Sequence, residues 1–358
     1  MRRSDVGSTS SSTSTASENE RETPLMNLNT FTDELDRGTV DQIQNTRQNR
    51  FTHILLLREV TAPARFTTDG ETVNTMKIRT GDPRGESLVT RVVDLFYRKQ
   101  PGAERRTAKS IQRDILDDVD TCADDRMHPN DMQQNSVESV LFGSAAGNES
   151  ISQRSRVYYN SAYSIRAADA ALQQNTQNAS GDQTRVDAEE GQGTWTPDFV
   201  KPGMLFPSIV TLDSATPEEV LFTLATIART ARYGASESRG GNVRNHFLDI
   251  YTGRQDGPAN LELTRVAASS LASDGDEYTK TDLRDIVHGP PIDIEDAADA
   301  VRSAYRSLQE RRGLQFDRIT GEDVQSVVET LGDSEELETI LERQHEKVED
   351  YVDEFNGE

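Results

Sequence analysis

Three stretches of the chain are apolar and β-branched enough to predict buried strands. Residues 51–60 (FTHILLLREV) form the first, residues 206–212 form the second, and residues 247–251 begin the third. Runs of this length with β-branched and aromatic side chains are typical of strands. We expect residues 51–60 to form a central strand of the main sheet.

A helix is predicted between the second and third strands. Thr216 and Glu219 have the spacing of a capping box, and Pro217 occupies the first helical position. Apolar side chains then recur at helical spacing as far as Ala231. Gly234 follows at a place where a helix commonly ends in the left-handed conformation. The pattern therefore predicts a strand, a helix, a loop and a strand in direct succession.

Other segments have weaker patterns. Residues 91–98 alternate imperfectly and are interpreted as a strand, whereas residues 107–119 have apolar side chains at helical spacing. Residues 79–87 form a turn-rich basic loop. Residues 173–193 are polar and rich in Gly and Asn, which predicts a long flexible loop.

The end of the chain is predicted to be helical. Residues 293–312 are followed by Gly313, residues 320–331 begin with a capping pattern, and residues 334–355 carry one apolar stripe. The stripe has two interpretations, which are packing against this protein's own domain and docking onto a neighbouring subunit. The first is favoured.

Composition divides the chain into three regions. Residues 1–27 are rich in Ser and Thr and lack apolar periodicity, which predicts a disordered tail. Residues 28–269 contain the predicted strands and are expected to form the main domain, with insertions near 80–140 and 165–200. Residues 270–358 are expected to form an acidic helical region. The fold class is therefore α+β.

Length and composition bound the class of protein. The chain has 358 residues, 34% of them hydrophobic, and a formal net charge of −23. It has no apolar run of about 18 residues, so we expect a soluble, cytoplasmic protein with no membrane partner. The lone Cys122 excludes an internal disulfide and fits a reducing compartment.

The charge is distributed unevenly. Residues 42–113 hold 14 basic and 7 acidic residues, a balance of +7, and residues 226–254 hold 5 and 2, a balance of +3. By contrast, the balance is −12 over residues 114–225 and −16 over residues 270–358. Two basic segments therefore lie within an acidic protein, which keeps a nucleic-acid partner open despite the overall charge.

Lysine is scarce, with 6 residues against 33 arginines. An acidic, lysine-poor composition is typical of proteins from salt-loving archaea, and we infer a haloarchaeal type of sequence. In molar salt the Debye length is about 3 Å, so binding of a polyanion must rely on short-range contacts. Arginine forks on phosphate supply such contacts.

The loop after the predicted helix is a candidate anion site. It contains Arg232, Arg239 and Arg244, and its Gly240-Gly241 pair lets backbone approach a ligand closely. An ordinary solvated loop is the alternative interpretation. A second set of candidate nucleic-acid contacts is Arg98, Lys99, Arg105, Arg106, Arg79, Arg84 and Arg156. For the cationic run made of Arg98, Lys99, Arg105, Arg106 and Lys109, a solvated helix face is the alternative.

Motifs for other chemistry are weak. Residues 81–85 lack the ending of a P-loop, and Cys122 with His128 offers too few ligands for structural zinc. Asp82 lies in a basic loop and is a candidate to cut nucleic acid with a metal ion, but acidic residues are abundant throughout this chain. We therefore predict no catalytic residue, no cofactor and no bound metal.

Several ordered segments resemble a known family. They are VKPGMLFPSIVTL, TPEEVLFTL and RTARYGASESRGGNVRNH within residues 200–246, ETVNTMKI at 71–78, VTRVVDLFYRKQPGAERRTAK at 89–109, and Leu141-Phe142-Gly143 followed by Ser155-Arg156-Val157. Residues 28–250 thereby resemble the backbone subunit of the type I-D CRISPR effector complex, a family of repeat-associated RNA-binding proteins.

The resemblance implies a fold and a function. The fold would be an RRM-like or ferredoxin-like antiparallel palm with helical and lid or thumb insertions. The protein would not be an enzyme; several copies would assemble along the spacer of a CRISPR RNA, beside other effector subunits, and present its bases to target DNA. Two alternatives stay open: a member of the same superfamily that also cleaves the target strand, and a halophilic structural protein without RNA.

Overall fold

The computed structural model describes residues 26–68, 72–128, 132–145, 152–174, 177–178, 194–195, 197–234, 241–273 and 277–356. Nearly all of the predicted disordered tail, and most of the predicted loop at 173–193, lie outside the described residues. Arg239 and Gly240 of the candidate anion loop lie outside them as well.

The main sheet has five antiparallel strands in the order β12-β11-β1-β10-β4. These are β1 (Phe51–Val60), β4 (Val157–Tyr159), β10 (Leu205–Asp213), β11 (Val243–Gly253) and β12 (Phe316–Thr320). The first predicted strand is confirmed in both its bounds and its central place in the sheet. Edge strand β12 was not predicted, because its short polar sequence lies between two strong helical patterns.

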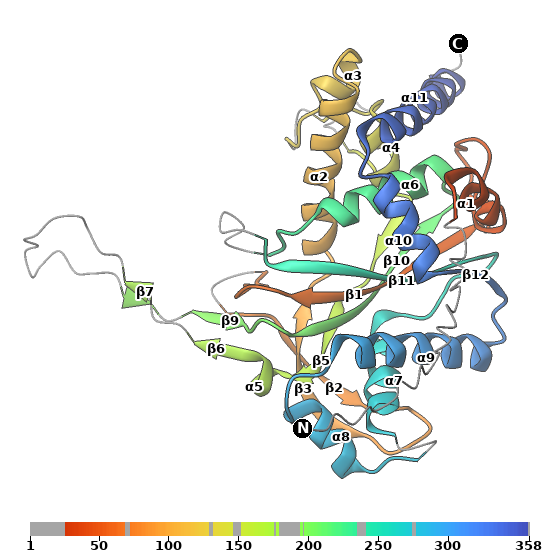
Figure 1. Cartoon of the computed structure of the whole chain (residues 1–358). Coiled ribbons are helices and arrows are strands. Elements are labelled where there is room, and N and C mark those ends of the chain that lie inside the picture. The colour runs from red at the N-terminus through yellow and green to blue at the C-terminus, as the bar shows by residue number, and fades with distance from the viewer. Residues whose placement is uncertain are drawn as a thin grey trace, which may run out of the picture.

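The palm has the ferredoxin-like chain path. Along the sequence, β1 is followed by helix α2 (Lys99–Ile115), then by β4 and β10, then by helix α6 (Pro217–Arg229) and β11. In space the four strands lie in the order β11-β1-β10-β4, and the two helices pack together over one face of the sheet (Figure 1). This β-α-β-β-α-β arrangement confirms the predicted palm.

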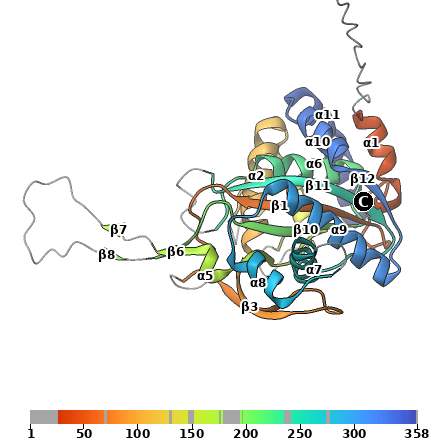
Figure 2. The same ribbon diagram turned by 60° about the horizontal axis from the view of Figure 1, so that its bottom comes forward.

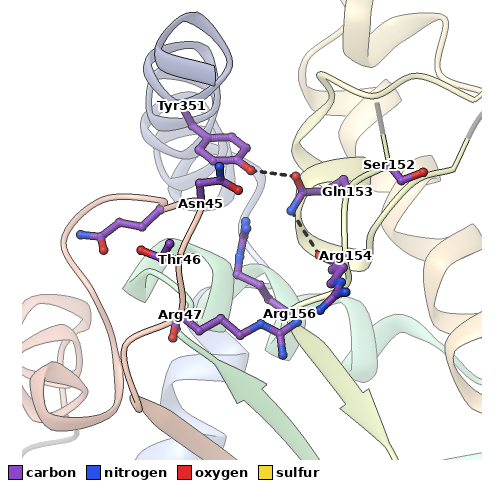
Figure 3. A pocket seen from close by; sticks show the side chains of 10 residues that line it. Asn45, Thr46, Arg47, Ser152, Gln153, Arg154, Arg156 and Tyr351 are labelled. Atoms are coloured by element: carbon purple, nitrogen blue, oxygen red, sulfur yellow. Dashed lines mark hydrogen bonds between the residues drawn. The ribbon is translucent and has the colours of Figure 1, made fainter. Parts of the chain in front are cut away.

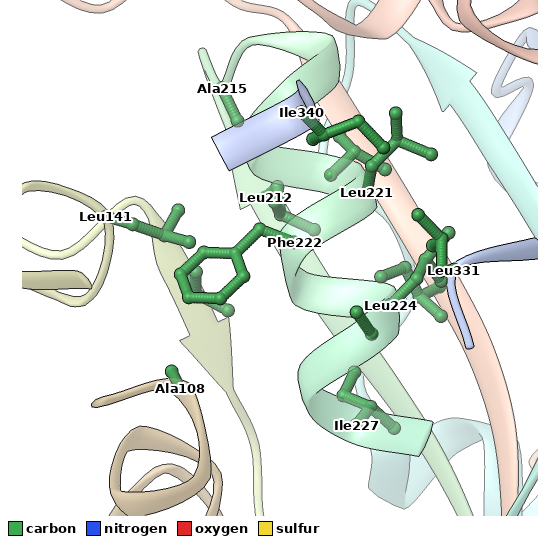
Figure 4. Close-up of a cluster of buried hydrophobic side chains, with 14 of the residues drawn as sticks. Ala108, Leu141, Leu212, Ala215, Leu221, Phe222, Leu224, Ile227, Leu331 and Ile340 are labelled. Atoms are coloured by element: carbon green, nitrogen blue, oxygen red, sulfur yellow. The ribbon is translucent and has the colours of Figure 1, made fainter. Parts of the chain in front are cut away.

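Helices cover both faces of this sheet. Ile54 and Leu56 of β1 belong to the core under α2 and α6, where Phe222 is central (Figure 4). Leu55 and Leu57 point the other way, into a core with α7 (Asn260–Ala272) and α9 (Ile294–Arg312). Burial on both faces explains why β1 is a continuous apolar run. It also means that neither face of the palm sheet is an open platform for RNA.

The predicted capping box of α6 is confirmed. The Thr216 hydroxyl accepts from the Glu219 N–H at 3.2 Å, and the Glu219 carboxylate accepts from the Thr216 N–H at 2.9 Å. The predicted end of the helix was wrong. The helix ends at Arg229, with Thr230 in an extended cap, and Gly234 lies beyond it with φ +84°. Gly234 is needed there because a Cβ would lie 2.3 Å from the Arg65 carbonyl oxygen.

Helix α2 begins earlier than its apolar pattern indicated, at Lys99 and not near residue 107. Pro101 and Gly102 look like helix breakers in the sequence. Proline is tolerated in a first helical turn because those N–H groups have no partner within the helix. The cationic residues 98–106 therefore lie in the first turns of a helix.

A second sheet and two ribbons extend the palm. The second sheet has the order β2-β3-β5, with β2 (Thr75–Thr80), β3 (Leu88–Leu95) and β5 (Ala162–Ala167). Short ribbons lead away from the body of the protein (Figures 1 and 2). They pair β6 (Leu172–Gln174) with β9 (Asp198–Val200), and β7 (Gln177–Asn178) with β8 (Thr194–Trp195).

The C-terminal region is helical, as predicted. Asp293 caps α9 and Gly313 ends it in the left-handed conformation. Leu337 and Leu341 of α11 pack into the core around α6, so this apolar stripe belongs to the protein's own fold. The remaining helices are α1 (Leu28–Glu34), η1 (Asp36–Gly38), α3 (Asp120–Ala123), α4 (Val137–Phe142), α5 (Ala168–Ala171), α8 (Lys280–His288), α10 (Gly321–Thr330) and α11 (Ser334–Asn356).

Candidate nucleic-acid interface

A surface groove lies between α2 and the segment that follows α6. Its free volume is about 510 Å³. Arg106 comes from the first basic segment of the sequence, whereas Arg229 and Arg232 come from the second. The fold therefore brings one arginine of the first basic segment beside two arginines of the second at one surface. The full lining is Ala103, Arg106, Thr107, Ser110, Arg229, Thr230, Ala231 and Arg232.

The two walls of the groove have different origins. Arg106 lies on the exposed side of α2, whose opposite side buries Ala108 and Ile111 in the core. Arg229 ends α6, and its guanidinium donates to the carbonyl oxygen of Leu331 at 2.9 Å. This hydrogen bond ties the α6 wall to α10, so the groove has a fixed rim on that side.

The base of the glycine-rich loop is closed by a hydrogen-bonded clamp. The Asn242 side chain accepts from the Tyr233 N–H at 2.9 Å and donates to the Tyr233 carbonyl at 2.7 Å. The Asn242 N–H also donates to the Ala231 carbonyl at 2.8 Å. Gly241 and Arg244 are exposed just beyond this clamp. Arg232, Gly241 and Arg244 therefore flank one loop at the end of the groove.

A buried network supports the groove from beneath. Arg58 of β1 lies 2.9 Å from the Glu104 carboxylate of α2, and both side chains are 0% exposed. The Tyr233 hydroxyl accepts from Arg58 at 2.8 Å and donates to Glu104 at 2.8 Å. Burial raises the pKa of Tyr233 well above its ordinary value, so it remains a neutral hydrogen-bonding group. This network was not predicted from the sequence, although Arg58 within an apolar strand was a signal for it.

The start of α2 offers an aromatic surface beside cations. Tyr97 is 39% exposed, and the Arg98 guanidinium lies 5.7 Å from the centre of its ring. Both residues line a hollow of about 590 Å³ that also contains Lys99 and Asp94. Burial raises the pKa of the Asp94 carboxyl. An exposed ring next to basic side chains suits stacking of an unpaired base beside its phosphate.

Two arginines of the predicted set have acidic partners inside the protein. Arg105 binds the buried Glu138 at 2.5 Å, and the neighbouring Lys109 binds the same carboxylate at 2.6 Å. Arg156 pairs with Glu219, the residue that caps α6. These three cations hold α2, α4, β4 and α6 together. We therefore leave Arg105 and Arg156 out of the interface.

Arg79 and Arg84 are exposed, but they lie on the β2–β3 hairpin and not at the groove. Asp82 at the tip of this hairpin accepts from the Arg84 N–H at 2.9 Å and pairs with Arg311 of α9. Burial opposes ionisation of Asp82, but Arg311 and the Arg84 N–H hold its pKa below the ordinary value. This carboxylate is engaged in anchoring the hairpin.

A third hollow, of about 470 Å³, was not foreseen from the sequence (Figure 3). It lies beside α11, whose Tyr351 hydroxyl donates to the Gln153 side chain at 2.9 Å. Arg47 at its edge binds Asp213 at 3.1 Å and the Ser155 carbonyl at 3.2 Å. Most of its polar groups thus serve internal contacts.

The structure also bears on the candidate metal ligands. Cys122 is buried, and burial raises the pKa of its thiol. Within the described ranges, no group of three His, Cys, Asp or Glu side chains is placed to hold a metal ion. None of the helices in the same ranges is long and apolar enough to cross a membrane.

These features define a class: a ferredoxin-like palm with insertions, covered on both faces of its sheet, with three arginines at a groove between α2 and the segment that follows α6. A family model described as Csc2 CRISPR matches residues 39–344. The chain belongs to the Csc2 CRISPR family.

A solved structure shares this fold. The crystal structure of Thermofilum pendens Csc2 superposes with a TM-score of 0.55 and 16% identity, covering 90% of this chain and 96% of that one. A chain of a CRISPR RNA-guided surveillance complex gives a TM-score of 0.47 and 12% identity, covering 75% of this chain and 87% of that one. No curated protein matches the sequence.

Proposed function

We propose that this protein is the guide-RNA-binding backbone subunit of a CRISPR effector complex of type I-D. The observation that carries the proposal is that Arg106, from the first basic segment of an acidic chain, lines the same groove as Arg229 and Arg232 from the second. Membership of the Csc2 CRISPR family supports it.

The groove is suited to an RNA backbone and not to base readout. Its polar groups are guanidinium forks and hydroxyls from Thr107 and Ser110, which match phosphate and sugar oxygens. The palm sheet, which would offer a stacking platform in other RNA-binding folds, is covered by helices on both faces. Sequence selectivity would therefore reside in the guide, whose bases stay free to pair with target DNA.

Several copies would lie side by side along the spacer of the guide, each holding a short segment. The arginine-rich groove fits this role at high salt, because guanidinium forks act at short range where screening is strong. Arg239, Gly240 and Gly241, which precede Asn242, and Arg244 at the start of β11 would add to the phosphate contacts.

The first test is to purify the protein in molar KCl and to sequence the nucleic acid that accompanies it. Discrete RNAs with a repeat-derived flank are expected. Protein that carries no RNA, and that also fails to bind added RNA at its working salt, would overturn the proposal and favour a structural role without RNA.

A pair of double variants tests the groove itself. Arg106→Ala with Arg232→Ala should lower RNA affinity by at least about tenfold, because a hydrogen bond to a charged group contributes about 1.5–3 kcal/mol. Arg284→Ala with Arg343→Ala, two exposed arginines of the C-terminal region, is the matched control. Equal affinities for both double variants would contradict the placement of RNA in the groove.

A further inference from the structure

The β2–β3 hairpin presents a row of cations on its outward face. Lys77 of β2 lies directly opposite Arg91 of β3, and Arg79 lies opposite Val89. All four side chains are exposed, Val89 by 64%. Because alternate residues of a strand share a face, the three cations form one patch, which we call the ribbon patch.

The ribbon patch is unusual for this protein. Like charges directly opposite each other destabilise a sheet, and the chain has 62 acidic residues from which to supply partners. Yet no acidic side chain of the described residues pairs with Lys77, Arg79 or Arg91. An anion from outside the chain would offset this cost.

The acidic residues of the hairpin are engaged elsewhere. Asp82 pairs with Arg311 of α9, and Glu86 pairs with Lys280 of α8. The Tyr278 hydroxyl accepts from the Asp82 N–H at 3.0 Å and donates to the Glu86 carbonyl at 2.8 Å. The C-terminal region therefore neutralises the hairpin's carboxylates and fixes its tip, while the cations stay exposed.

The inner face of the hairpin is packed into the protein. Ile78 and Val92 form a small core with Tyr163, against which Leu261 of α7 packs. The ribbon patch is therefore a fixed surface on a rigid element. It lies with α7 and α8, on the other side of the palm from α2 and α6 (Figures 1 and 2).

We propose that the ribbon patch binds the phosphodiester backbone of a second nucleic-acid strand, separate from the segment held in the groove. The proposal rests on the proposed function. Lys77 and Arg79 are two residues apart on one strand, so their spacing is about 7 Å, which resembles that of successive phosphates on an extended single strand. Val89 beside them offers an apolar contact for a sugar.

A nucleic acid fits this patch better than an acidic protein surface does. A strand supplies one anion for each nucleotide in a regular line, whereas protein carboxylates have no such repeat. Two sources share this chemistry, the target DNA paired with the guide and a more distant segment of the guide RNA itself, and we assign the patch to the target DNA. The experiment separates them.

The test uses the effector complex reconstituted on its guide, with Lys77→Gln, Arg79→Gln and Arg91→Gln combined in this subunit. Guide occupancy should be unchanged, while affinity for complementary single-stranded DNA should fall by at least about tenfold. The dependence of log affinity on log salt should become less steep by about 2, since each lost single-strand phosphate contact removes about 0.7. Arg113→Gln, Arg254→Gln and Arg343→Gln form the control, and thermal melting checks the fold of both.

Each outcome has one meaning. Loss of guide binding with DNA affinity unchanged per loaded complex would place the guide on the patch and overturn the second-strand proposal. Failure of subunits to assemble, with both nucleic acids bound normally, would assign the patch to an acidic protein surface and also overturn it. If guide occupancy, DNA affinity and its salt dependence all stay unchanged in the triple variant, the patch has no nucleic-acid role and the proposal is overturned. Failure of the wild-type protein to bind any guide would instead overturn the proposed function.

Discussion

The Arg58 guanidinium and the Glu104 carboxylate lie 2.9 Å apart and are both fully buried. Arg58 belongs to the central strand of the palm, and Glu104 belongs to the helix that carries Arg106. Tyr233, just before the glycine-rich loop, hydrogen-bonds to both. The ion pair and Tyr233 together thus tie α2 and the segment that follows α6 to the central strand of the palm.

Glu104→Gln should therefore weaken both the fold and the groove. Removing one charge of a buried pair leaves the other uncompensated, which costs about 3–5 kcal/mol. We expect the free energy of unfolding to fall by that order in denaturant titrations. We also expect RNA affinity to fall at temperatures where the variant is still folded.

The control replaces both partners, as Arg58→Met with Glu104→Leu. Because no charge is left buried and unpaired, this double variant should be more stable than Glu104→Gln. A Glu104→Gln variant with wild-type stability would show that the pair contributes little to the fold.

Arg105 and Arg106 are neighbours on α2 with different surroundings, which gives a direct comparison. Arg105 binds the buried Glu138, whereas Arg106 is exposed at the groove. Arg105→Ala should lower the free energy of unfolding and leave RNA affinity of the folded protein unchanged. Arg106→Ala should lower RNA affinity and change the free energy of unfolding less than Arg105→Ala does. Thermal melts and filter binding on the two variants measure both quantities, and a drop in RNA affinity for Arg105→Ala alone would contradict the assignment.

Tyr97 is expected to stack on an unpaired base at the start of α2. Its ring is exposed and lies beside Arg98. Tyr97→Ala should weaken single-stranded RNA binding by about 1–3 kcal/mol, the range for loss of one stacked base. Tyr97→Phe keeps the ring and should bind nearly as well. If both variants bind like wild type in fluorescence titrations, no base stacks on this ring.

Local signals in the sequence predicted much of the fold. The bounds of β1, the capping box of α6 and the end of α9 before Gly313 each depend on residues close together in the chain, and the structure confirms all three. The start of α2 was missed because Pro101 and Gly102 look like breakers. Gly234 was wrongly predicted to end the helix, because a glycine is required there by the close approach of Arg65, which is far away in the sequence.

The site was harder to predict for the same physical reason. Sequence shows where cations cluster but not which of them meet acidic partners after folding. Arg105 and Arg106 are indistinguishable as letters, and the sequence alone does not show that Arg105 meets the buried Glu138. Arg156 was predicted to contact nucleic acid, but in the folded protein it pairs with Glu219. The groove could not be predicted from the sequence, because it forms only when α2 packs against α6.

His53 should make the stability of the protein depend on pH. The ring is buried in β1, within hydrogen-bonding distance of the Thr211 hydroxyl at 3.1 Å and the Gln255 carbonyl at 3.2 Å, and burial lowers its pKa to about 4. The unfolded chain protonates this residue at about pH 6.5, whereas the folded protein resists protonation down to about 4. The stabilising contribution is therefore complete above pH 6.5 and is lost progressively as the pH falls toward 4. At one pKa unit per 1.36 kcal/mol, the loss approaches about 3 kcal/mol. Denaturant titrations at pH 7.5 and pH 5 measure it, and His53→Gln should reduce the difference between them; an equal difference in the variant would assign the pH dependence to other groups.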